Sequence, residues 1–187
     1  MNSKDAIKSS MNMGNLISMA YLEDLTDEDM MERPHAECNH IKWQVGHLIV
    51  SEHNIIEACL PGSMPTLPEG FAEQYSKETA GDDDADHFHT KANLLEQYEA
   101  QRAGTLAALE TLSDDDLSKA SPESISGYAP DWGTAFVMQG SHWLMHAGQW
   151  AVVRRQLGRP PLFLFLAKLK ISWSCEFFNS QSQIADS

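Results

Sequence analysis

The sequence predicts an all-α protein built as a four-helix bundle. Two observations indicate this fold: four long stretches carry apolar residues at helical spacing, and segments rich in proline, glycine or acidic residues separate them. We expect the bundle to form one domain over residues 1–162. Residues 163–187 form a predicted C-terminal extension, partly disordered, in which residues 169–173 alternate like a short strand but also suit a fifth helix.

The first two predicted helices precede the longest loop. The first covers residues 4–25 and stops in an acidic segment before Pro34. The second covers residues 39–60 and ends where Pro61 and a glycine follow. Its main apolar stripe, with steps of three and four residues, contains Ile41, Val45, Leu48, Glu52, Ile55 and Cys59. Trp43 lies on another side, so we expect this helix to be mostly buried.

The last two predicted helices follow that loop. Residues 61–86 are expected to be loop, because prolines and glycines interrupt any periodicity there. The third helix covers residues 90–112, and a linker containing two prolines occupies residues 120–130. The fourth helix covers residues 133–157. Gly158 and two later prolines give it the usual C-terminal signature of a helix.

Composition and charge exclude several classes of protein. The chain has 187 residues and a formal net charge of −14, from 13 basic and 27 acidic side chains. This charge repels phosphate backbones and anionic lipid, so we expect no nucleic-acid and no membrane partner. Three irregularly spaced cysteines give no disulfide framework and favour a cytoplasmic setting. We find no signal peptide, and the longest apolar run, residues 162–167, is far too short to cross a bilayer.

The fourth predicted helix places two histidines on its buried face. The stripe contains Ala135, Gln139, His142, Trp143, His146, Trp150, Val153 and Leu157. His142 and His146 therefore lie one turn apart and can reach a common point, as metal-binding imidazoles do. The pattern fits equally well a pair of hydrogen-bonded core histidines, with Gln139 or Gln149 satisfying their ring nitrogens.

A third metal ligand would come from the second predicted helix, which offers His40, His47 and His53. His47 lies off the main stripe, on the same side as Trp43. If that side also faces the bundle interior, His47 can meet the two histidines of the fourth helix. Periodicity permits His40 equally well, whereas His53 flanks the stripe on the opposite side.

Other chemistry-bearing residues give weaker signals. His35, Cys38 and His40 form an H-x-x-C-x-H motif that could bind zinc, but the sequence offers no matching second pair of zinc ligands. His87 and His89 lie beside the acidic residues 82–84 and suit at most weak surface binding of metal. Cys38 and Cys59 have no recognisable base partner, so we expect inert thiols.

Three segments resemble the DinB-like (DinB/YfiT) superfamily of metalloproteins. Residues 142–149 read H-W-L-M-H-A-G-Q, and residues 154–161 read R-R-Q-L-G-R-P-P, like the last helix of that family. Residues 39–48 read N-H-I-K-W-Q-V-G-H-L, and the family has a tryptophan four residues before its first metal-binding histidine, as Trp43 precedes His47 here. The order of elements also agrees, over residues 5–162.

The resemblance implies a DinB/YfiT-like bundle with one divalent metal held by His47, His142 and His146. Three neutral ligands suit Zn²⁺ or Ni²⁺ and leave a position open for water or substrate, as in catalytic sites. Gln149 or Asn54 is expected to orient these ligands. Characterised branches of the family include transferases that use low-molecular-weight thiols, so the resemblance implies a metal-dependent thiol S-transferase that acts on small molecules.

Two alternatives stay open at this stage: a metal-dependent hydrolase, and a non-catalytic, stress-associated metal-binding bundle. A structural protein without metal is a third. The sequence identifies no general base, which weakens the case for hydrolysis. It also identifies no thiol-binding residue. Members of the family are often dimers, and the C-terminal extension is too apolar to be left in water. We therefore expect either a homodimer formed through the first or last helix, or an extension folded against its own bundle. The aromatic residues of the extension are Phe163, Phe165, Trp173, Phe177 and Phe178.

Overall fold

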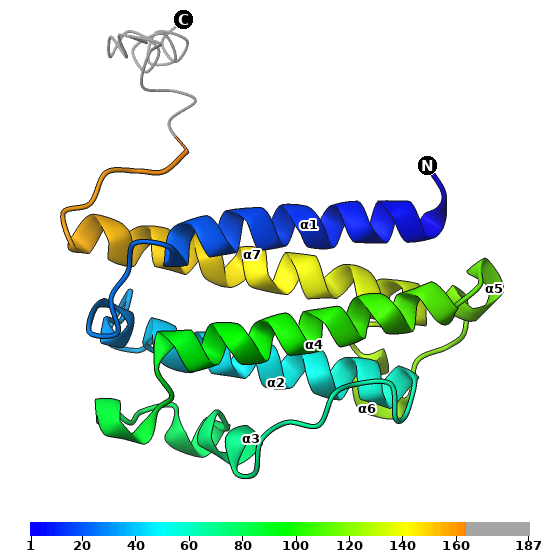
Figure 1. Cartoon of the computed structure of the whole chain (residues 1–187), viewed down its shortest axis with the longest axis horizontal. Coiled ribbons are helices and arrows are strands. Elements are labelled where there is room, and N and C mark those ends of the chain that lie inside the picture. Colours follow the sequence, from blue (N-terminus) through cyan, green and yellow to red (C-terminus); the bar gives the residue numbers. More distant parts are fainter. Residues whose placement is uncertain (164–187) are drawn as a thin grey trace, which may run out of the picture.

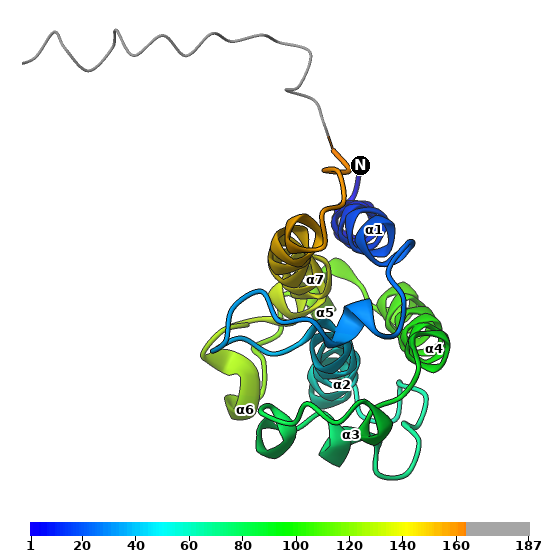
Figure 2. The same cartoon turned by 90° about the vertical axis from the view of Figure 1, so that its left-hand side faces the viewer.

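The computed structural model describes residues 1–163, and its four long helices pack side by side (Figures 1 and 2). These helices are α1 (Ser3–Leu22), α2 (Ile41–Cys59), α4 (Lys91–Thr111) and α7 (Trp132–Gln156). Within the described residues there is no strand, and one isolated bridge joins Ala120 to Asp131. The predicted all-α four-helix bundle is therefore confirmed. The strand or fifth helix and the disorder predicted for the extension lie outside the described residues.

The long helices begin where a side chain caps their free N–H groups. Asn2 and Asp5 form a reciprocal capping box at the start of α1. Asp131 accepts from Thr134 N at the start of α7. The predicted end of the first helix, residue 25, is three residues too late. After the helix, Thr26 N donates to the Asp29 carboxylate, and Asp29 N donates to Thr26 Oγ1. A 3-10 helix, Asp29–Met31, begins at this turn.

The segments predicted as loop and linker contain short helices. The loop between α2 and α4 carries α3 (Phe71–Gln74) and two 3-10 turns, Lys77–Thr79 and Ala85–His87. Phe71 and Tyr75 are fully buried and anchor this loop to the bundle. Before α7, α5 (Asp114–Leu117) lies ahead of the predicted linker of residues 120–130, and α6 (Glu123–Ser126) lies within it. Single turns of this kind depend on packing, which explains why periodicity did not predict them.

One long connection gives the bundle its topology. The loop of residues 60–90 returns along the bundle, so α2 and α4 run in the same direction, and α1 and α7 also run parallel to each other (Figure 1). Ion pairs mark the two ends: Lys8 with Glu110 at one, and Arg154 with Asp24 at the other. As a result α2 is antiparallel to α7, and these two helices bring the candidate site together.

The core follows the apolar stripes read from the sequence. All six residues of the α2 stripe are buried, and so is Trp43 on its second side. The α7 stripe is buried from Ala135 to Val153, apart from the partly buried His142. Among residues 1–163, no helix is long and apolar enough to cross a membrane.

Helices α1 and α7 touch through glycine. A Cβ atom added at Gly140 would lie 2.6 Å from Ser10 O, and one added at Gly14 would lie 2.5 Å from Gly140 O. Both neighbours are backbone atoms of the packed helices, so neither can move alone. Gly148, on an exposed face of the same helix α7, has no such neighbour within 4 Å.

We therefore expect Gly140→Ala and Gly148→Ala to change stability in opposite directions. Gly140→Ala should lower the free energy of unfolding by about 1–3 kcal/mol, because it overpacks the contact. Gly148→Ala should raise it by up to about 1 kcal/mol, because alanine is the better helix former. Urea unfolding of both variants measures the difference, and equal effects would contradict the close α1–α7 contact.

Candidate metal centre

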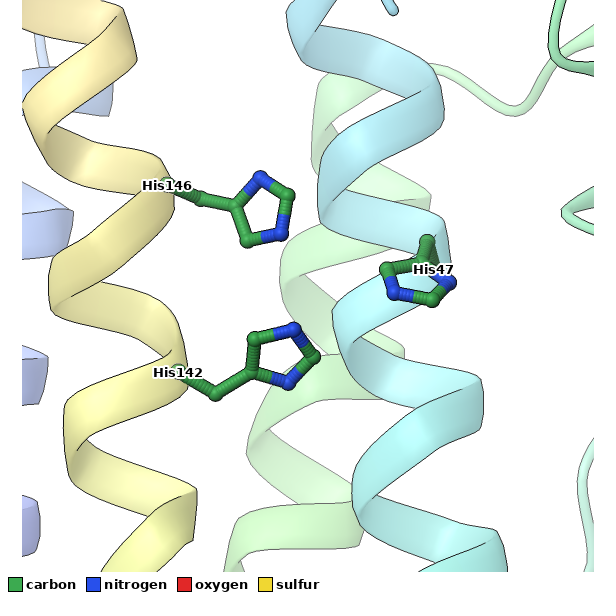
Figure 3. Close-up of side chains that lie close together, drawn as sticks. All are labelled: His47, His142 and His146. Carbon is green, nitrogen blue, oxygen red and sulfur yellow. The ribbon is translucent and has the colours of Figure 1, made fainter. Parts of the chain in front are cut away.

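Three histidines from two antiparallel helices converge in the bundle (Figure 3). His47 comes from α2, and His142 and His146 come from successive turns of α7. One ring nitrogen of each lies within 4.8 Å of the other two. Ring centroids are 5.5 Å apart for His47 and His142, 5.9 Å for His47 and His146, and 5.1 Å for His142 and His146. The structure thus brings together the three histidines named from the sequence.

Burial keeps these imidazoles neutral. Desolvation, followed by the neighbouring histidines, lowers the pKa of His142 and His146 to about 4. Desolvation also lowers the pKa of His47 below its usual value. At neutral pH each ring therefore carries a lone pair on one nitrogen, which is the form that binds metal.

A glutamine from α2 fixes the tautomer of His146. Gln44 Nε2 donates to the backbone carbonyl of Asn39 at 2.6 Å, and Trp150 Nε1 donates to Gln44 Oε1 at 2.8 Å. A carbonyl only accepts and an indole N–H only donates, so the orientation of the amide is determined. His146 Nδ1, 3.0 Å from the same Gln44 Oε1, must then be the protonated nitrogen. The lone pair of His146 consequently lies on Nε2.

A tryptophan positions His47. The Trp43 indole is stacked on the His47 ring with centroids 5.0 Å apart and an angle of 7° between the planes. Trp43 Nε1 donates to Ser76 O at 3.2 Å and to Thr79 Oγ1 at 3.0 Å, both in the loop between α2 and α4. This long loop therefore supports the histidine group, through a ring that limits how the imidazole can turn.

The three histidines fit a divalent metal ion. All three donors are neutral nitrogens, the ligand type that suits Zn²⁺ and Ni²⁺. Nitrogens around a tetrahedral Zn²⁺ are about 3.3 Å apart, given Zn–N bonds of about 2.0–2.1 Å. The observed upper limit of 4.8 Å is somewhat longer, so small rotations of the rings suffice. Among residues 1–163 no other group of three potential ligands lies this close together.

An open pocket adjoins two of the histidines. It has a volume of about 330 Å³ and is lined by His47, Ser51, Ile55, Tyr128, Met138 and His142. We call it the Ser51 pocket. Ser51 follows His47 by one turn of α2, and Met138 precedes His142 by one turn of α7, so the pocket extends from the histidines toward α6.

Residues expected to orient the histidines have other positions. Gln149 acts only indirectly, since it accepts from Gln44 Nε2 at 2.9 Å. Gln139 donates to Ala135 O within its own helix. Asn54 is exposed. Of the two residues expected to orient the ligands, Gln149 does so only through Gln44, and the exposed Asn54 has no hydrogen bond to the histidines. The sequence reasoning missed Gln44. Its signal was a glutamine about one turn before His47 in a helix predicted to be mostly buried.

The remaining histidines and cysteines lie outside the group. His40, the alternative left open by periodicity, caps α2 by accepting from Trp43 N. His53 pairs with Gln101, and the exposed His87 pairs with Asp82. Positions that likewise contribute nothing to the histidine group are His35, Cys38, Cys59 and His89. Burial raises the pKa of the Cys59 thiol, as expected of an inert cysteine.

The hydrogen bonds of Gln44 make a prediction about the metal-free protein. We expect the ¹⁵N spectrum of His146 to show the Nδ1–H tautomer, and Gln44→Met to add the Nε2–H form, because it removes the acceptor. Two-bond ¹H–¹⁵N correlation spectra distinguish the two forms. His53, whose partner Gln101 is untouched, is the internal reference. An unchanged His146 spectrum in Gln44→Met would show that Gln44 does not set the tautomer.

One of three comparisons with known proteins found a match, and it agrees with this arrangement. The searches of curated proteins and of solved structures found none. The family model of the DinB superfamily matches residues 17–150, which include all three histidines. Because that match covers more than half of the chain, the protein belongs to the DinB superfamily.

Proposed function

We propose that the chain binds a divalent metal, Zn²⁺ or Ni²⁺, through His47, His142 and His146, and activates a low-molecular-weight thiol for transfer to a small molecule. The observation that carries this proposal is the convergence of three neutral histidines beside an open pocket. A divalent ion at these nitrogens would lower the pKa of a thiol and stabilise its thiolate. Three uncharged ligands leave the ion's charge uncompensated.

The protein's own residues hold the donors ready. Gln44 keeps His146 Nε2 free of a proton, and Trp43 restricts the ring of His47. In the transfer, the thiol sulfur forms a bond to an electrophilic carbon of the substrate, and the leaving group departs with its electron pair. The thiol proton passes to solvent through the open Ser51 pocket.

The surroundings favour a thiol over water as the nucleophile. Among the described residues that line the pocket there is no carboxylate to act as a base. Glu52, next to Ser51 in sequence, is bound by Arg102 and by Thr105 Oγ1, so it is not free to take a proton. A thiol has a pKa near 8.5 and needs far less help to ionise than water does. Turnover of an ester or amide without added thiol would instead support the hydrolase.

We expect His47→Ala, His142→Ala and His146→Ala each to abolish stoichiometric metal binding. Changing partners outside the ligand set typically costs about 10–100-fold in metal affinity, so removal of a ligand should cost more. Isothermal titration of untagged protein with Zn²⁺ measures this, and circular dichroism checks that the helices persist. His53→Ala is the matched control on α2, and it should bind like wild type. Loss of binding in His53→Ala alone would show that the face of α2 carrying His53, and not the face carrying His47, supplies the ligand.

Metal binding should also resist mild acid. Three histidines with an ordinary pKa of about 6.5 would each lose about 30-fold in affinity at about pH 5, because protons compete for the nitrogen. The pKa values of His142 and His146 are about 4, so these two lose almost nothing there. We expect Zn²⁺ affinity at about pH 5 to lie within about 30-fold of its neutral value and to fall as pH drops through about 4. A loss above about 1,000-fold at pH 5 would contradict the buried, neutral site.

A further inference from the structure

The Ser51 pocket has the size of a site for a small organic molecule. A dry cavity of about 150 Å³ holds benzene, and this pocket of about 330 Å³ is roughly twice as large. Its two histidines lie at one end, so a ligand whose sulfur is at the histidines has its carbon skeleton among the other lining residues. Tyr128, which follows the end of α6, is also among the lining residues. α6 itself lies on the side of α2 opposite α4 (Figure 2).

The chemistry of this lining is uncharged. Ile55 and Met138 are apolar, and Ser51 and Tyr128 each offer one hydroxyl. Tyr128 is 55% exposed, so its ring forms a wall that faces solvent. Pockets with mostly apolar walls and a few hydroxyls select molecules by shape and by one or two hydrogen bonds. Apart from the two histidines, no side chain of the described lining could neutralise a carboxylate or an ammonium group.

Basic side chains near the pocket are committed elsewhere. Arg102 pairs with Glu52: its Nε lies 2.9 Å from Glu52 Oε1, and its Nη2 donates to Glu52 Oε2 and to Gln139 O. The chain as a whole carries a formal charge of −14, which repels multiply anionic molecules. The carboxylates of a thiol that carries several would therefore lose hydration in this pocket and gain no basic side chain in return.

We propose that the Ser51 pocket selects a monothiol whose body is uncharged and largely apolar, with Ser51, Tyr128 and Met138 as its specificity-determining residues. This inference rests on the proposed function, because the histidine group supplies the sulfur end of the site. It narrows the thiol class to molecules such as arylalkyl or alkyl thiols, and it disfavours thiols that carry several charged groups.

The test compares two thiols on the untagged full chain loaded with Co²⁺. Phenylmethanethiol has an apolar body, and mercaptosuccinate carries two carboxylates. The sulfur-to-cobalt charge-transfer band reports thiol binding at the histidine group, and titration of that band gives the affinity. We expect phenylmethanethiol to bind at least about tenfold more tightly, as expected for an unpaired charge left beside an apolar wall. Equal affinities, or tighter binding of mercaptosuccinate, would overturn the proposal.

A charge placed in the pocket should reverse this preference. Met138→Lys adds a cation to the lining and should favour mercaptosuccinate by about tenfold relative to wild type. Met145→Lys is the matched control: it adds the same charge on α7, at a side chain that is 58% exposed and does not line the pocket. It should keep the wild-type preference. The same shift in both variants would overturn the pocket assignment, because it would show only an effect of net charge.

Two separate measurements distinguish this inference from the proposed function. Co²⁺ stoichiometry, measured before any thiol is added, tests the histidine group alone. If Co²⁺ does not bind, the proposed function fails and the thiol preference fails with it. If Co²⁺ binds and the wild-type preference is absent, only the assignment of the Ser51 pocket is wrong. The wild-type comparison needs no variant, so misfolding of Met138→Lys cannot rescue the proposal.

Discussion

Hydrogen bonding of buried polar groups fixes how α2 lies against α7, and the histidine group depends on that register. On one side of His47, Gln44 receives hydrogen bonds from two residues of α7. On the other side, Glu52 binds Arg102, which also donates to Gln139 O of α7 at 3.0 Å. A slide of either helix by one turn would leave these buried groups without partners, at a cost of about 1–3 kcal/mol for each. The histidines lie between the two networks and are held by both.

The long helices could be predicted because apolar periodicity and helix caps are local properties of the sequence. The predicted ranges agree with the observed helices to within three residues, as for α1, which ends at Leu22 instead of residue 25. Periodicity also placed His142 and His146 on the inner face of α7. It could not choose between His40 and His47. The family resemblance made that choice, and in the structure His40 is used as the N-cap of α2.

The parts that escaped prediction depend on contacts between distant segments. The short helix α3 exists because Phe71 and Tyr75 are buried against the bundle, and no periodicity appears in four residues. Gln44 gained its role only when α7 was placed beside it, since its hydrogen-bond partner Trp150 is 106 positions further along the chain. Whether the three histidines hold a metal, and whether the chain forms a homodimer, stay predictions.

The side chains around the histidines leave an open approach through the Ser51 pocket. Trp43 and Gln44 occupy the side toward the start of α2, and Trp150 closes it from α7. The space left on the other side is the Ser51 pocket, whose described lining is uncharged. Glu52, the residue after Ser51, is outside that lining and is paired with Arg102. A divalent ion held by the three histidines would therefore meet no carboxylate in the described lining of the pocket. Its charge would be available to an anionic group such as a thiolate.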